Sequence, residues 1–218
     1  MTIIASPAML AALRRYGSHV FIDGTWNVAD GRLQLVVIWV ATAVGKIMPC
    51  ALCITNAKDA AVYAYALQVI SECAGWVPTH VFTDFEKAIW VAVGMAFVGC
   101  NVLIWGCLWH FTQAVRRHLE NSVSYTKADI NVIMQAVHLA AYAYDKASFD
   151  AATKRIKSEM NNRVKKGHSS SWKYFQDTWM GQMGNRGWNT QNWALFHRVH
   201  SFVCTLTAGT VMYRMAVA

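Results

Sequence analysis

Two aspartates that each follow a short apolar run are the residues of this sequence best suited to metal chemistry. Asp23 follows Val20-Phe21-Ile22, and Asp84 follows Val81-Phe82-Thr83. Such runs predict buried strands, and a carboxylate at a strand end has a fixed backbone and a side chain that faces solvent. On one sheet the two carboxylates could converge on Mg²⁺ or Mn²⁺, which promote in-line displacement at phosphorus. Alternatively, each aspartate only caps a turn or the following helix.

The elements predicted around these aspartates form an α/β fold. A short amphipathic helix precedes the first strand, and a tight turn at Val44-Gly45 joins the next two strands into an antiparallel meander. Helices and strands then alternate, so the predicted order is three strands followed by helix, strand, helix and strand. The remaining predicted ranges are 8–15 (helix), 33–43 and 46–54 (strands), a helix from Asn56 or Asp59 to about residue 73, 86–97 (helix) and 101–105 (strand). Gly75 and Pro78 are expected to end the helix that reaches residue 73.

The second half of the sequence has helical periodicity and no strand signal. Residues 127–144 and 149–165 predict two helices, which we interpret as an all-helical insertion after the fifth strand. We therefore expect a catalytic core over 1–120, the insertion over 121–180 and a C-terminal remnant of the core over 181–218. Basic side chains near the end of the insertion are either a solvated helix face or a DNA phosphate contact surface, namely Lys154, Arg155, Lys157, Arg163, Lys165 and Lys166.

The composition of the chain limits the kinds of protein that it can be. The chain has 218 residues, 55% of them hydrophobic, which is enough to bury one good core, and its net charge of +8 fits a polyanionic partner. The six cysteines are irregularly spaced and no secretory signal is evident at the start, so we expect reduced thiols inside the cell. The apolar run 88–109 is long enough to span a membrane, but three glycines divide it, and we expect no membrane association.

Three blocks of this sequence together resemble the transposase domain of Mutator-like elements (MULE), a branch of the RNase H-like DDE transposases. The first is Phe21-Ile22-Asp23-Gly24-Thr25, with Ala5-Ser6-Pro7 before it. The second is Thr83-Asp84-Phe85-Glu86-Lys87-Ala88. The third is a C-x-x-H block formed by Cys107 and His110. The likeness extends from about residue 4 to about residue 179.

The resemblance implies an RNase H-like mixed five-stranded sheet flanked by helices, with the helical insertion placed after strand five. It also implies that Asp23 and Asp84 are catalytic metal ligands for Mg²⁺ or Mn²⁺, with Cys107 and His110 supporting the active site. The implied activity is metal-dependent DNA strand cleavage and transfer in the nucleus. The implied partners are transposon ends and target DNA, and a homo-oligomer is possible.

The sequence departs from the family at the third metal ligand, a glutamate in a block resembling T-N-N-x-x-E-S. The two candidate stretches, 189–198 and 205–214, contain no acid, and no Asp or Glu follows Asp177. Two carboxylates can hold one hydrated ion but not fix a second, so we expect the chain to be inactive or nearly so. Glu159 or Asp177 could substitute only if the insertion folded back over the sheet.

Two alternatives remain open at this point. Cys50 and Cys53 could join Cys107 and His110 in a structural zinc site, although we favour core packing for the first two and do not expect zinc. The chain could also be a domesticated DNA-binding or protein-interaction module that has no catalytic role. In that case the basic insertion, and not the aspartates, would carry the function.

Overall fold

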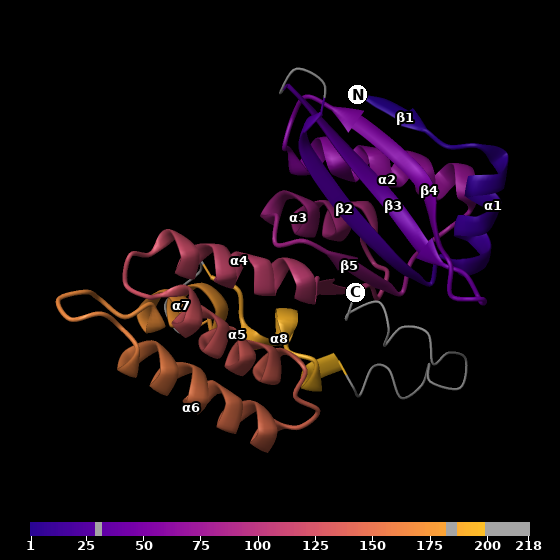
Figure 1. Ribbon diagram of the computed structural model, residues 1–218. Coiled ribbons are helices and arrows are strands. Elements are labelled where there is room, and N and C mark those ends of the chain that lie inside the picture. The colour runs from indigo at the N-terminus through magenta and orange to yellow at the C-terminus, as the bar shows by residue number, and fades with distance from the viewer. Residues whose placement is uncertain (29–31, 182–186, 199–218) are drawn as a thin grey trace. The chain divides into compact units, whose positions relative to one another are not determined.

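The computed structural model of the chain describes residues 1–28, 32–181 and 187–198. Contacts divide these residues into two compact units, one ending at Cys107 and the other beginning at Leu108 (Figure 1). The first unit contains all the described strands, and the second is helical over its described length. Each unit is considered by itself below.

The first unit is built on a six-stranded mixed sheet with the strand order β1-β4-β3-β2-β5-β6. β2, β3 and β4 form the predicted antiparallel meander, while β5 runs parallel to β2 and β6 runs parallel to β5. The strand bounds are Thr2–Ile4 (β1), His19–Val28 (β2), Leu33–Ala41 (β3), Ile47–Thr55 (β4), His80–Thr83 (β5) and Leu103–Gly106 (β6).

The prediction of five strands was wrong by one, because the chain begins with a short strand. β1 pairs antiparallel with β4, with Thr2 opposite Ile54 and Ile4 opposite Leu52. A strand of three residues is too short to show the alternation from which strands are recognised in a sequence. The sheet is therefore extended by one strand beyond the predicted meander.

Three helices complete the first unit, and α2 begins and ends at capping residues predicted from the sequence. They are α1 (Pro7–Tyr16), α2 (Ala60–Ala74) and α3 (Lys87–Ala96). The carboxylate of Asp59 accepts hydrogen bonds from the N–H groups of Ala61 and Val62, which fixes the start of α2. Gly75 ends α2 in the left-handed conformation, with φ of 59°.

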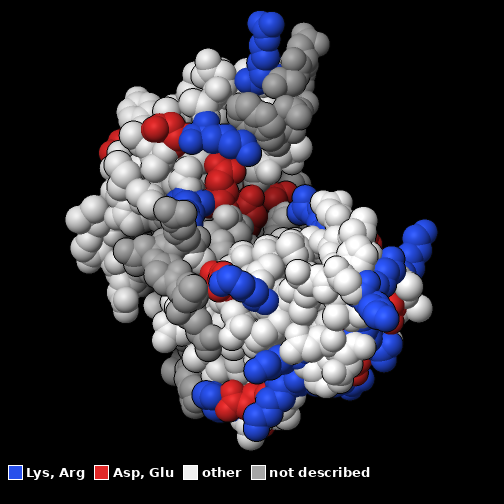
Figure 2. Space-filling view, turned by 90° about the vertical axis from the view of Figure 1, so that its left-hand side faces the viewer, with Lys and Arg blue, Asp and Glu red and all other residues white. Residues whose placement is uncertain are grey.

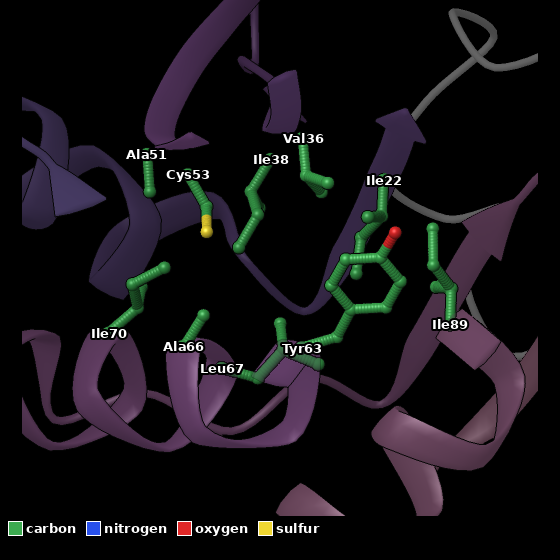
Figure 3. Close-up of a pocket in the computed structure, with 10 residues that line it drawn as sticks. All are labelled: Ile22, Val36, Ile38, Ala51, Cys53, Tyr63, Ala66, Leu67, Ile70 and Ile89. Carbon is green, nitrogen blue, oxygen red and sulfur yellow. The ribbon is translucent and has the colours of Figure 1, made fainter. Parts of the chain in front are cut away.

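The core of the first unit lies between the sheet and the layer of α2 and α3. Strand residues such as Ile22 and Ile38 meet Leu67 and Ile70 of α2 and Ile89 of α3 around a small apolar cavity (Figure 3). Its volume of about 20 Å³ is close to that of a single water molecule, so this cavity is a packing defect and not a ligand site.

The second unit contains five helices within the residues that the structure describes. Their bounds are α4 (Leu108–Asn121), α5 (Lys127–Ala141), α6 (Lys146–Asn162), α7 (Trp172–Trp179) and α8 (Thr190–Trp193). The two helices predicted over 127–144 and 149–165 are thus confirmed as α5 and α6, with their ends shifted by a few residues. None of the helices in the described part of the chain is both long and apolar enough to cross a bilayer.

At the start of the parallel strand pair, His19 of β2 and His80 of β5 are register partners with stacked rings. Their ring centroids lie 4.4 Å apart at an interplanar angle of 4°. Burial, together with the charge of His80, lowers the pKa of His19 from 6.5 to about 4, and burial also lowers the pKa of His80. Two stacked imidazoles that resist protonation make the sheet sensitive to acid.

We expect the stability of the first unit to fall as the pH drops from about 6.5 to about 4. In this window the unfolded chain binds a proton at His19 that the folded chain does not, so stability is complete above pH 6.5 and decreases below it. The loss should be about 2 kcal/mol for His19, after allowing for its partial exposure. Urea unfolding at pH 7 and pH 4.5 measures this loss.

Replacing both His19 and His80 with asparagine should make the free energy of unfolding less dependent on pH. Replacing the exposed His168 is the control and should leave the pH dependence unchanged. A double variant with the same pH dependence as the wild type would contradict the expectation.

Candidate active site

The two candidate metal ligands occupy neighbouring positions at one end of the parallel strand pair. The register of β2 and β5 ends with Ile22 opposite Thr83. Asp23 and Asp84 are the residues that follow this last pair. Neighbouring strands are spaced about 5 Å apart, so carboxylates at these positions can share a ligand. Asp23 is exposed and Asp84 is partly buried. The arrangement suits one hydrated divalent ion.

Asp23 does not end its strand, which corrects the prediction of two strand-end aspartates. β2 continues to Val28, because its other edge pairs with β3 beyond this point, and Asp23 lies opposite Val37. Only the parallel pairing with β5 stops at Ile22. Asp84 follows the last residue of β5, as predicted. The backbone of Asp23 is therefore fixed by the hairpin of β2 with β3.

The backbone turn after Asp84 is held by two hydrogen bonds. The Glu86 N–H donates to Oδ1 of Asp84 over 3.1 Å, and the indole Nε1–H of Trp90 donates to the Asp84 carbonyl over 2.8 Å. Asp84 thus stabilises the turn into α3, as the capping alternative proposed: its carboxylate accepts from the residue before the helix, and its carbonyl accepts from a side chain of the helix. A capping role and a ligand role are compatible, because a carboxylate has two oxygens.

A buried polar cluster next to this turn was missed in the sequence. Gln34 of β3 and Tyr63 of α2 are buried. The Tyr63 hydroxyl has two acceptors for its one proton, Oε1 of Gln34 and Oε1 of Glu86, the second at 2.9 Å. Burial, reinforced by the hydrogen bond to Glu86, raises the pKa of Tyr63 well above its usual value. The signal in the sequence was a glutamine at the start of an otherwise apolar strand.

Gly24, in the first family-like block, leaves room for this cluster. A Cβ atom at Gly24 would lie 2.7 Å from Nε2 of Gln34, which is closer than real contacts of a Cβ atom allow. The glycine therefore lets the amide of Gln34 pass close to the β2 backbone.

The C-x-x-H pair lies at the end of β6. The Cys107 N–H donates to the Thr83 carbonyl over 2.7 Å, which extends the β5 and β6 pairing by one residue. His110 lies in the first turn of α4, where the ring of Trp109 meets it edge-on at 4.8 Å. Cys107 closes the first unit and His110 belongs to the second. Their predicted support of the active site stays a prediction.

Cys50 and Cys53 are residues of the hydrophobic core. Both are buried, and burial raises the pKa of the Cys50 thiol to about 11 and also raises that of Cys53. Zinc is bound by the thiolate, which such burial disfavours. Within the described ranges, no three His, Cys, Asp or Glu side chains are grouped to hold a metal ion.

The predicted basic surface separates into paired and unpaired side chains. Arg163 contacts Glu159 at 2.6 Å and Asp129 at 3.2 Å, and Arg155 lies 3.8 Å from Glu159. Arg163 therefore joins α5 to the end of α6, whereas the pair of Arg155 with Glu159 lies within α6. In contrast, Lys154, Lys157, Lys165 and Lys166 are exposed and make no ion pair with the described acidic residues. Lys and Arg side chains are spread over the face drawn in Figure 2, several beside an acid.

The stretch 189–198, a candidate for the missing third ligand, belongs to the helical unit. Asn189 begins α8 with a capping box, and the buried Trp193 donates its Nε1–H to the Trp179 carbonyl over 2.7 Å. The other candidate stretch, 205–214, lies outside the described residues. Glu159 and Asp177, the two proposed substitutes, are already engaged by Arg163 and Lys173.

Comparison with known proteins agrees with the pattern of motifs. No curated protein matches the chain. The sequence model of the MULE transposase domain matches residues 19–114, a segment that includes Asp23, Asp84, Cys107 and His110. The match begins at the first residue of β2 and ends within α4. Residues 19–114 of this chain therefore belong to the MULE transposase domain family.

Proposed function

We propose that the chain is a MULE-type transposase catalytic domain for metal-dependent DNA cleavage and transfer, with little or no remaining activity. The observation that carries this proposal is the placement of Asp23 and Asp84 directly after the last register pair of β2 and β5, inside the matched segment. The order of three antiparallel strands followed by alternating helices and strands supports an RNase H-like DDE fold. Such a domain acts on DNA, and we propose the nucleus as its location.

Asp23 and Asp84 would hold a single Mg²⁺ or Mn²⁺. Hard oxygen donors suit these ions, which are commonly bound by one or two carboxylates with water and substrate phosphate completing the shell. A bound ion would polarise a phosphate oxygen and favour deprotonation of water. Asp84 is oriented by its contact with the Glu86 N–H, and Asp23 by its place in β2. Among the described residues no third acid is grouped with them to hold a metal ion, so a second ion is not expected, and strand transfer should be weak or absent.

The test is Mn²⁺ binding together with nicking of supercoiled plasmid DNA, comparing the wild type with Asp84→Ala. We expect one Mn²⁺ per chain, an affinity reduced about tenfold or more in the variant, and nicking close to background in both. Asp150→Ala is a matched control, because Asp150 is an aspartate of α6 that pairs with Lys146. Equal Mn²⁺ affinity in wild type and Asp84→Ala would refute the metal site. Nicking by the wild type alone would show that another ligand completes the site and that the expected inactivity is wrong.

The second candidate function is non-catalytic DNA binding, which the exposed lysines favour. Each lysine that neutralises a DNA phosphate contributes about 0.9 to the slope of affinity against salt concentration. Lys165→Gln/Lys166→Gln should therefore reduce this slope by about 2 and weaken binding several-fold at low salt. The control is Lys146→Gln/Lys173→Gln, since those two lysines are paired with Asp150 and Asp177.

Fluorescence anisotropy of a DNA duplex over a salt series measures both variants. An unchanged slope in the first variant would contradict DNA contact by Lys165 and Lys166. DNA binding that survives loss of both Asp23 and Asp84 would favour the non-catalytic module over the catalytic domain.

A further inference from the structure

The buried cluster of Gln34, Tyr63 and Glu86 lies beside the aspartate pair but is not part of the proposed metal site. Its members come from β3, from α2 and from the residue before α3. Oε1 of Glu86 contacts the Tyr63 hydroxyl at 2.9 Å, and Oε2 accepts from Nε2 of Gln34 at 3.4 Å. Three elements that are far apart in the sequence thus meet at one carboxylate.

Because Gln34 and Tyr63 are buried, their polar groups depend on the partners within this cluster. Gln34 is fully buried and Tyr63 is 3% exposed, and a buried polar group left without a partner is destabilising. Figure 3 shows the Tyr63 ring rising from α2 with its hydroxyl directed away from the helix. The hydroxyl contacts both Gln34 and Glu86, and Gly24 leaves the space that the amide of Gln34 needs. A shift of Glu86 would leave these groups unsatisfied.

Glu86 is also bonded to Asp84 through its backbone. Its N–H donates to Oδ1 of Asp84, while its carbonyl accepts from the N–H groups of Ile89 and Trp90 at the start of α3. The Glu86 side chain makes no capping bond to α3 and instead reaches to β3 and α2. Fixing the Glu86 side chain therefore fixes the N–H that orients the Asp84 carboxylate.

Both carboxylate oxygens of Glu86 already have partners. Oε1 is engaged by Tyr63, and Oε2 by Gln34 and by Lys58, whose Nζ lies 3.7 Å away. An acid held by three side chains on the core side of the sheet serves as an anchor and not as a replacement for the missing third ligand.

We propose that Glu86 is a positioning residue for Asp84, and that the buried pair of Gln34 and Tyr63 holds Glu86 in place. This role rests on the proposed function as far as the metal is concerned, because Asp84 would be the ligand. The hydrogen-bonded geometry of the turn is independent of the metal, so the two parts can be tested separately.

The test uses the chain of 218 residues and two measurements, amide hydrogen exchange at residues 86–90 and Mn²⁺ affinity. Tyr63→Phe removes only the hydroxyl, and Tyr125→Phe is the matched control. Tyr125 is likewise buried, and its hydroxyl donates to the Met160 carbonyl and accepts from the Ser171 N–H in the other unit. We expect Tyr63→Phe to speed exchange at residues 86–90 about tenfold and to weaken Mn²⁺ binding several-fold, while Tyr125→Phe changes neither.

Glu86→Gln and Glu86→Ala provide the conservative and the drastic replacement. Glutamine keeps an acceptor for the Tyr63 hydroxyl, so Glu86→Gln should retain slower exchange and tighter Mn²⁺ binding than Glu86→Ala. Exchange and affinity that are unchanged in Tyr63→Phe and in Glu86→Ala would overturn the proposal. If the wild type binds no Mn²⁺, the proposed metal function fails, and the exchange rates still decide whether this cluster holds the turn.

Discussion

Phe111→Ala is expected to destabilise the helical unit by about 3–5 kcal/mol, the range for removing a fully buried phenylalanine side chain. Phe111 of α4 has no exposed surface and packs against aromatic side chains of α7 and α8. Its ring centroid lies 4.1 Å from that of Trp193 in a stacked arrangement and 4.9 Å from that of Trp179 edge-on. Removing the ring leaves a cavity where three helices meet, and the loss is a large fraction of the stability of a typical domain, which is about 5–15 kcal/mol.

Hydrogen exchange followed by mass spectrometry measures this loss separately in each unit. Peptides from α4 to α7 should show an opening free energy lower by the stated amount, and peptides from β2 to β5 should be unchanged. Trp109→Ala is the control, because Trp109 is a neighbouring aromatic residue on the same helix but is 54% exposed; it should cost less than about 1 kcal/mol. A cost below about 1 kcal/mol for Phe111→Ala would mean that the aromatic cluster does not stabilise the packing of α4 against α7 and α8.

Gly17→Ala is expected to destabilise the first unit by about 3 kcal/mol, through steric overlap together with a weakened hydrogen bond. Gly17 ends α1, and a Cβ atom there would lie 2.3 Å from Nε1 of Trp76. That indole is 4% exposed and donates to the Gly17 carbonyl over 2.7 Å. Since the ring also packs edge-on against Phe97, it has little room to move.

Gly94→Ala provides a control of opposite sign. Gly94 is an exposed residue inside α3, and a Cβ atom there would meet nothing within 4 Å. Alanine is favoured over glycine in a helix, so this variant should gain about 1 kcal/mol. Chemical unfolding of the two variants beside the wild type gives both values. Equal stability of Gly17→Ala and the wild type would show that α1 can move away from Trp76 at little cost.

The proposed loss of catalysis has a simple basis in charge and geometry. Asp23 and Asp84 are neighbours in a rigid sheet, whereas Glu159 and Asp177 are paired with basic residues of their own helices. Recruiting either acid would break its ion pair with Arg163 or Lys173. In the proposed site, two carboxylates would therefore hold the metal, together with water and the phosphate of a substrate.

The sequence by itself determined the elements of the first unit other than β1, and the two aspartates. Apolar runs bounded by glycine, proline and aspartate predicted β2 to β6, and the capping residues Asp59 and Gly75 predicted the ends of α2. These signals are local, because each depends on side-chain periodicity or on the backbone preference of one residue. The motif blocks around Asp23 and Asp84 are local in the same sense.

Only the tertiary structure decided which distant residues act together. Gln34, Tyr63 and Glu86 have no regular spacing in the sequence, and they meet because β3, α2 and the turn before α3 converge at one end of the sheet. Similarly, ion pairs with Glu159 and Asp129 separate Arg155 and Arg163 from the exposed lysines. Burial and pairing depend on contacts between elements. The partner of a charged residue or of a lone glutamine therefore cannot be predicted from the local sequence.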